Sequence, residues 1–169
     1  MSNPTEKQLD EALKSALMNR PDFSRWFLGK TRFGSEDAHC VFCRADHPWS
    51  SVSISLPDEG TNERTTLRKE CETDVLVVFE TPDGRRLAVH IENKRVGGSF
   101  TPYQPELYQA RKDQWKERER LGGYTEATTV LVAPTDFIAK NRDSVGHFDA
   151  HVSHEEIAAF VPEFGICHS

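Results

Sequence analysis

The chain has 169 residues, of which 37% are hydrophobic and 28% charged, and this length and composition predict one ordinary folded domain spanning residues 1–169. No apolar run approaches the roughly 20 residues that cross a bilayer, and the polar start at residues 1–7 lacks the hydrophobic stretch of a secretion signal. We therefore expect neither a membrane protein nor a secreted one. The formal net charge of -6 argues against a protein whose whole surface coats nucleic acid.

The charge is unevenly distributed along the chain. Residues 85–120 carry nine basic and five acidic side chains, a net of +4, whereas residues 1–84 carry 10 and 15 and residues 121–169 carry two and seven. The basic third is therefore the part suited to facing phosphates. Four cysteines without a secretion signal indicate reduced thiols in a cytoplasmic protein.

The first third of the chain predicts two helices and then a long irregular segment. Residues 5–8 form a capping box, and apolar residues follow at helical spacing, so a first helix is expected to run to about Asn19. A short second helix is expected at 23–28. Residues 29–72 are rich in Gly, Ser, Thr, Pro and charge, which indicates a variable, loop-rich insertion with one edge strand at 51–56.

A β-hairpin is predicted at the centre of the sequence. Strand-like runs at 73–80 and 87–94 flank a turn at 81–84 that contains proline and glycine. Asp74 and Glu92 are equally distant from the turn, so an antiparallel hairpin places their carboxylates opposite each other. Because side chains alternate along strands, one face is apolar and the other is an open polar face with Asp74, His90, Glu92 and Lys94.

The last third alternates helices and a strand. A second capping box at 101–104 predicts a helix through about Arg120, where a Gly-Gly pair ends it. Residues 127–133 have the composition of a buried strand, and a short helix is predicted at 155–160. The element order predicts an α/β protein with one mixed central sheet flanked by helices.

The two opposed carboxylates point to metal chemistry. Side by side on a hairpin, Asp74 and Glu92 repel each other unless a cation lies between them. Mg²⁺, or Mn²⁺ in its place, takes a few carboxylate oxygens and keeps several waters, which leaves room for a phosphate oxygen and an attacking water. Lys94 would reach the same site and orient that water, and the backbone carbonyl of Asn93 could supply a further ligand. The alternative is a solvent-facing ladder of salt bridges.

These residues resemble the PD-(D/E)XK phosphodiesterase superfamily, which has the restriction-endonuclease-like fold. Asp74 followed by Glu92-Asn93-Lys94 is similar to its (D/E)-x-K element, and residues 104–108 have the Q-x-x-x-Y spacing of its exonuclease-like members. Ile91-Glu92-Asn93-Lys94 with the following helix is most similar to a group of uncharacterised bacterial members. Asn93 departs from the usual apolar middle residue of the motif.

The resemblance implies roles for residues outside the hairpin. Superfamily members often add an acid from the first helix as a metal ligand, and Asp10, beside the apolar face of that helix, is the candidate. In the later helix, Gln104 and Tyr108 would brace the site or contact substrate. Arg111 and Lys112 would meet phosphates. For Gln104, Tyr108 and Arg111 the alternative is ordinary helix packing.

The sequence thus predicts a Mg²⁺-dependent nuclease that acts on DNA rather than RNA. The alternative is a catalytically inactive protein of the same fold that binds nucleic acid or regulates a partner. A homodimer is compatible with the prediction, because two cuts in a duplex need two centres. Cys40, Cys43 and His47 have spacing compatible with Zn²⁺, and Cys71 could complete such a site, but a single C-x-x-C pair is incomplete.

Overall fold

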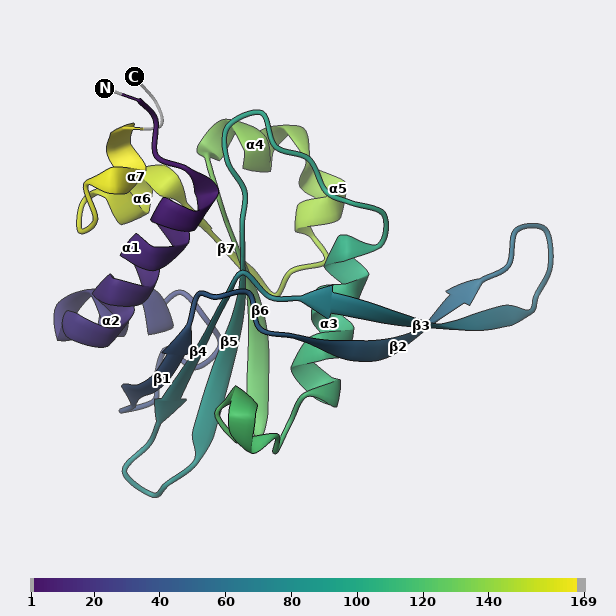
Figure 1. Ribbon diagram of the computed structural model, residues 1–169, viewed down its shortest axis with the longest axis horizontal. Helices are drawn as coiled ribbons and strands as arrows, with labels where there is room; N and C mark the ends of the chain where they lie inside the picture. Colours follow the sequence, from purple (N-terminus) through teal and green to yellow (C-terminus); the bar gives the residue numbers. More distant parts are fainter. Residues whose placement is uncertain (1, 167–169) are drawn as a thin grey trace.

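The computed structural model describes residues 2–166, and its elements are arranged as Figure 1 shows. In chain order they are α1 Glu6–Asn19, α2 Pro21–Leu28, β1 His39–Arg44, β2 Trp49–Pro57, β3 Arg64–Glu72, β4 Val75–Glu80, β5 Arg86–Asn93, α3 Gln104–Gln114, η1 Glu119–Leu121, β6 Glu126–Ala133, α4 Thr135–Lys140, α5 Arg142–Val145, β7 Ala150–Ser153, α6 His154–Ala158 and α7 Glu163–Ile166. Within residues 2–166 no helix combines the length and the apolar character needed to span a bilayer.

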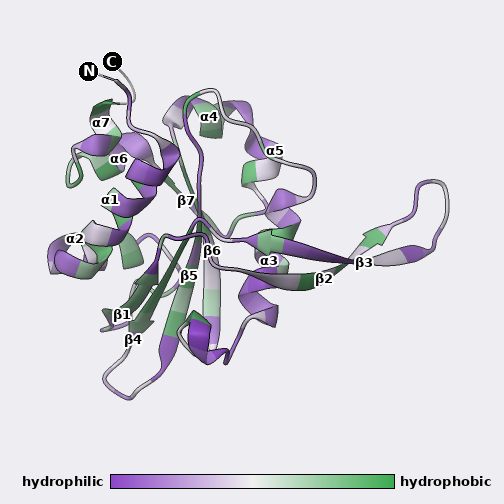
Figure 2. Ribbon diagram, viewed as in Figure 1, coloured by the Kyte–Doolittle hydropathy of each residue, from purple (hydrophilic) through white to green (hydrophobic). Residues whose placement is uncertain are grey.

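Five strands form the central sheet, in the order β1-β4-β5-β6-β7. β1, β4 and β5 are antiparallel to their neighbours, whereas β5, β6 and β7 run parallel. Figure 2 shows hydrophobic residues along the inner strands of this sheet. The predicted α/β class, with a mixed sheet flanked by helices, is confirmed.

Each face of the sheet is covered by its own set of helices (Figure 1). One apolar cluster joins one face of β4 and β5 to α1, α2, α6 and α7, with Leu9, Phe27 and Phe164 fully buried in it. On the opposite face, α3, α4, α5 and the β2–β3 ribbon pack against the sheet in two further clusters. Two helical layers therefore enclose the sheet, and the second layer covers the polar residues of the hairpin.

The predicted hairpin forms with the predicted register. Val75 pairs with Ile91 and Phe79 with Leu87, so the ladder, continued by one residue, sets Asp74 opposite Glu92. The six apolar residues expected on one face all lie in the cluster under α1. The other face, however, is not open as predicted, because α3 covers it and buries Asp74 and Glu92.

Residues 29–72 contain three strands where the sequence predicted one. The expected strand at 51–56 forms as part of β2, but it pairs with β3 in a separate two-stranded sheet that projects from the body (Figure 1). β1 is the edge of the central sheet. β3 was missed because its charged and polar residues alternate with few apolar ones, so its burial pattern is weak.

β1–β2 and β3–β4 form one long, kinked hairpin. Arg44 pairs with Leu76 in the central sheet and Trp49 pairs with Glu72 in the ribbon, so five steps along one chain segment match four along the other. The extra residue falls in the turn that contains His47, whose φ of 51° is left-handed. A bulge of this kind bends a strand and redirects its side chains, often beside a functional site.

The helix predicted through Arg120 is shorter. α3 ends at Gln114, because Trp115 turns into the core and Glu117 adopts a left-handed φ of 62°. Its predicted capping box is also wrong: Tyr103, not Thr101, is the N-cap residue. The capping boxes at 5–8 and before α6 form, and β6 extends the predicted strand by one residue. α4, α5, β7 and α7 are short elements that the sequence did not predict.

Candidate active site

Asp74 lies at the kink, immediately before β4. Its Oδ2 accepts the backbone N–H of Asn93 at 2.8 Å, which ties it to the end of β5. Its own backbone N–H is held by the Tyr108 hydroxyl at 3.2 Å, and that hydroxyl donates to the Ile91 carbonyl at 3.2 Å. The phenol of α3 therefore clasps the two strand ends that carry the acids. The predicted bracing role of Tyr108 is compatible with this contact.

Glu92, Lys94 and Gln104 form a closed hydrogen-bonded group. Lys94 Nζ lies 2.7 Å from Glu92 Oε1 and 2.9 Å from Gln104 Oε1. The amide nitrogen of Gln104 donates to the same Glu92 oxygen at 2.7 Å. Gln104 thus holds both the acid and the base of the E-x-K element, and it can do so because it occupies the first turn of α3.

The two carboxylates share an enclosed, electrostatically unfavourable space. Asp74 is 5% and Glu92 2% exposed. Burial, and next the charge of Glu92, raise the pKa of Asp74 well above its ordinary value of 3.8. Glu92 Oε2 is buried without a hydrogen-bond partner. A buried carboxylate oxygen with no donor is costly, so this oxygen is the clearest vacancy for a ligand in the cluster.

Asp10 from α1 joins the cluster from the opposite side of the sheet end. Its Oδ1 accepts the side-chain amide of Asn93 at 3.0 Å, and the amide oxygen of Asn93 lies 3.0 Å from His154 Nε2. The Asp10 side chain is fully buried, and burial raises its pKa. Its charge also contributes to raising the pKa of Asp74. The structure therefore brings Asp10 and Asn93 to the site that contains the E-x-K residues.

His47 is the member of the site that the sequence did not identify. Its Nε2 lies 3.0 Å from Asp10 Oδ2, and its Nδ1 lies 3.1 Å from Glu72 Oε1 and 3.8 Å from Asp74 Oδ1. Burial opposes a charge on the ring, but the hydrogen bonds to Glu72 and Asp10 outweigh it and raise the pKa of His47. Only the pairing of β1 with β4 brings this residue to Asp74, and nothing local in the sequence marks that pairing.

Arg111 and Lys112 are not placed as the sequence predicted. Arg111 is 2% exposed, and its guanidinium lies 3.8 Å from the centre of the Tyr108 ring. It has no surface to offer a phosphate, and it packs the far side of the clasp instead. Lys112 forms an ion pair of 3.1 Å with Asp149 at the outer end of β6 and β7.

The proposed zinc ligands do not converge. Cys43 is buried in the core and Cys40 packs against that core, while both ring nitrogens of His47 lie against carboxylates. Cys71 Sγ contacts the Ser50 carbonyl within the ribbon. Across residues 2–166, no group of three or more His, Cys, Asp and Glu side chains is arranged to hold a metal ion.

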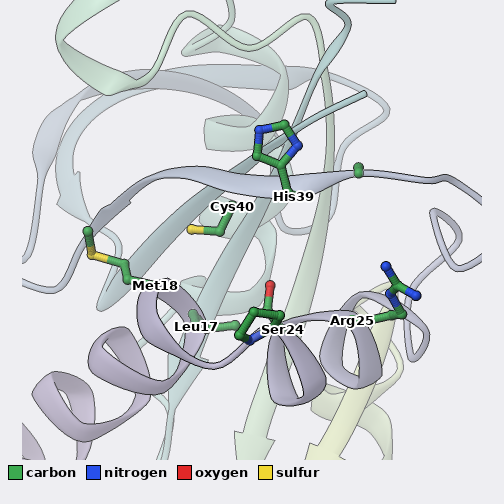
Figure 3. A pocket seen from close by; sticks show the side chains of 8 residues that line it. Leu17, Met18, Ser24, Arg25, His39 and Cys40 are labelled. Atoms are coloured by element: carbon green, nitrogen blue, oxygen red, sulfur yellow. The ribbon is translucent and has the colours of Figure 1, made fainter. Parts of the chain in front are cut away.

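Two pockets show where small molecules could enter. One, of about 180 Å³, lies between α1, α2 and β1, with Leu17, Met18 and Cys40 on its wall, and contains none of the predicted site residues (Figure 3). The other, of about 540 Å³, lies at the ends of β5 and β6. Its wall includes Gly98, whose backbone approaches the Lys94 side chain closely. The larger pocket therefore adjoins the carboxylate cluster.

Comparison with known proteins gives no relative: no family model, curated protein or solved structure matches this chain. The chemistry of the site therefore rests on its own geometry. It contains two carboxylates in contact, an ammonium on one of them, and an imidazole beside the other.

Proposed function

We propose that this protein is a Mg²⁺-dependent nuclease that hydrolyses DNA phosphodiester bonds, with a restriction-endonuclease-like fold of the PD-(D/E)XK type. The observation that carries the proposal is the convergence of Asp74, Glu92 and Lys94 at the end of one hairpin, with a buried oxygen of Glu92 lacking a partner. The mixed sheet between helical layers is compatible with that fold. Free thiols at Cys40, Cys43 and Cys71 agree with a cytoplasmic location.

The donor atoms fit a hard divalent cation. Asp74 and Glu92 would hold it, with the Asn93 carbonyl and Asp10 as further oxygen donors, and Mg²⁺ needs only one or two carboxylates because it keeps several waters. The raised pKa of Asp74 and the unpartnered Glu92 oxygen both report a shortage of positive charge. A bound Mg²⁺ would supply that charge, polarise a phosphate oxygen and lower the pKa of an attacking water.

The protein's own residues would orient the reaction. Lys94, with its side chain held by Glu92 and Gln104, presents an ammonium that can hydrogen-bond a water and oppose the negative charge that develops on the phosphate. Gln104 fixes the relative position of Lys94 and Glu92. Tyr108 fixes Asp74 by holding its backbone. Preorganisation of this kind lowers the cost of orienting groups at the moment of reaction.

The enclosure of the site favours one rival. Carboxylates at 5% and 2% exposure also suit a protein that has kept the fold as a nucleic-acid-binding or regulatory module without catalysis. The two functions differ in whether the cluster takes up a cation. A homodimer would place two such centres on a duplex, and both functions are compatible with it.

The proposal is tested by incubating the purified protein with Mg²⁺ or Mn²⁺ and plasmid DNA, single-stranded DNA or RNA. We expect cleavage of DNA, and its loss in Glu92→Gln and Lys94→Met, with circular dichroism showing that both variants are folded. The matched control is Glu70→Gln, which neutralises an exposed carboxylate on β3. Absence of cleavage on every substrate, together with no metal-dependent change in melting temperature, would instead support the inactive module.

A further inference from the structure

Trp49 is an exposed aromatic side chain at the base of the β2–β3 ribbon. The indole is 60% exposed. Its neighbours Ser50, Val52 and Ile54 are buried toward α3, so alternation directs Trp49 to the outer face. Among residues 2–166 no aromatic ring or cation stacks on it. A large exposed apolar ring commonly marks an interaction site rather than a packing residue.

The outer face at Trp49 is continuous with the carboxylate cluster. Trp49 pairs across the ribbon with Glu72, and Glu72 Oε1 lies 3.1 Å from His47 Nδ1. The same ring nitrogen lies 3.8 Å from Asp74 Oδ1. One cross-strand pair and one side chain therefore separate the exposed indole from the first carboxylate. His47 is also more exposed than the acids beneath it, so the approach to the cluster passes beside Trp49.

Basic side chains surround the start of β2. Arg120 donates to the Trp49 carbonyl at 3.2 Å, and Arg118 donates to the Ser50 hydroxyl. Arg44, from the end of β1, reaches the Arg120 carbonyl at 3.4 Å, although its charge is partly offset by Asp46. These arginines come from two segments distant in sequence. Together they give the surface beside an apolar ring a positive potential, which favours a polyanion over an apolar protein partner.

We propose that the Trp49 indole is a stacking platform for an unpaired nucleobase, with Arg118 and Arg120 beside the backbone of the same strand. The inference rests on the proposed nuclease function and assigns its substrate class: single-stranded nucleic acid, or a duplex with unpaired bases at the point of cleavage. Bases inside a continuous duplex are stacked on each other and offer no free face to an indole. Base stacking on an aromatic side chain needs no particular sequence, because every base has a flat face.

The test measures binding by tryptophan fluorescence in EDTA, where no cleavage can occur. Trp115 is fully buried and Trp26 partly buried, so the emission that acrylamide can quench comes mainly from Trp49. We expect a 12-nucleotide single strand to quench this emission and to protect it from acrylamide. A blunt duplex of the same length and a 12-unit abasic strand should protect it far less, because neither offers a free base.

Variants then measure the contribution of the ring. Trp49→Ala should weaken single-strand binding, followed by fluorescence anisotropy of a labelled strand, roughly five- to a hundredfold. Trp49→Phe should keep most of the affinity. Met18→Ala, which removes another exposed apolar side chain from α1, should change nothing. Binding of the abasic strand should be the same in Trp49→Ala and the wild-type protein.

Several results would overturn the stacking proposal. One is equal loss of single-strand and abasic-strand affinity in Trp49→Ala. Another is unchanged single-strand affinity in that variant. Self-association that depends on Trp49 and leaves the fluorescence indifferent to nucleic acid would identify the surface as a protein interface. Because these measurements require no metal, stacking without cleavage would contradict only the nuclease assignment, and cleavage without stacking would contradict only this inference.

Discussion

The Tyr108 hydroxyl accepts the backbone N–H of Asp74 at 3.2 Å, so a helix that follows the hairpin in sequence fixes the position of the first acid. Burial raises the pKa of Tyr108 well above 10, which keeps the phenol neutral and able to donate to the Ile91 carbonyl. The acid that closes one strand and the strand that carries the second acid are thereby held by a single oxygen atom.

Replacing Tyr108 by phenylalanine should separate the strand ends. The change leaves the Asp74 N–H and the Ile91 carbonyl buried without this partner, which costs about 1–3 kcal/mol in the free energy of unfolding measured with urea. Cleavage should also fall. Tyr124→Phe is the control, because that buried hydroxyl bonds His90 and the Lys112 carbonyl instead. A Tyr108→Phe variant as active as Tyr124→Phe would show that the clasp does not position Asp74.

The pH dependence of stability should reveal the carboxylate pair. Because the folded-state pKa of Asp74 is raised above its unfolded value near 3.8, Asp74 stabilises the fold most below that pH. This contribution is lost as pH rises through the raised pKa. His47, whose pKa is also raised, acts in the same direction. Melting temperatures from pH 4 to 8 should therefore fall more steeply in the wild-type protein than in Asp74→Asn.

Asp83 is the control for this measurement. A hydrogen bond from Thr81 lowers its pKa, so its contribution is present at neutral pH and is lost as pH falls through the lowered folded-state pKa. Asp83→Asn should therefore leave the decline between pH 5 and 8 unchanged. The same slope in Asp74→Asn and the wild-type protein would mean that Asp74 is not held in a charge-poor environment.

Mg²⁺ should reverse the same penalty. At pH 8, where both carboxylates favour a cation, the ion binds the folded state and should raise the melting temperature, by an amount equivalent to about 2.7 kcal/mol when its concentration is a hundred times its Kd. Asp74→Asn and Glu92→Gln each remove a ligand and should abolish this increase. Glu70→Gln should retain it. An equal increase in all four proteins would indicate non-specific binding of the ion.

The sequence could predict the acids of the site because a tight hairpin is a local structure. The turn centre and the alternation of Val75, Val77 and Phe79 determine which residues face each other, so Asp74 and Glu92 follow from position alone. The helical caps at Thr5 and Ser153 are local in the same way, and both form. Asp10 lies on the correct side because α1 has a single apolar face.

What the sequence could not predict depends on contacts between distant segments. His47 reaches Asp74 only because β1 pairs with β4, more than thirty residues later, and a bulge turns its ring inward. The cover of α3 over the polar face likewise needs the whole sheet, so Glu92 was expected to be open and is buried. Arg111 was predicted to meet phosphate from its helical spacing, which gives the face of a helix but not what covers it.

A final prediction concerns the turn behind the hairpin. Gly122 has a φ of 87°, and a Cβ there would lie 2.6 Å from Val78 Cγ2 on β4. Gly122→Ala therefore adds overpacking of about 1–3 kcal/mol to a left-handed strain of about 1–2 kcal/mol. Gly60→Ala has a similar φ of 77° but nothing within 4 Å, so it should show the strain alone. Urea unfolding that gives both variants the same loss would mean that Val78 yields, and that the packing behind β4 does not hold the hairpin in place.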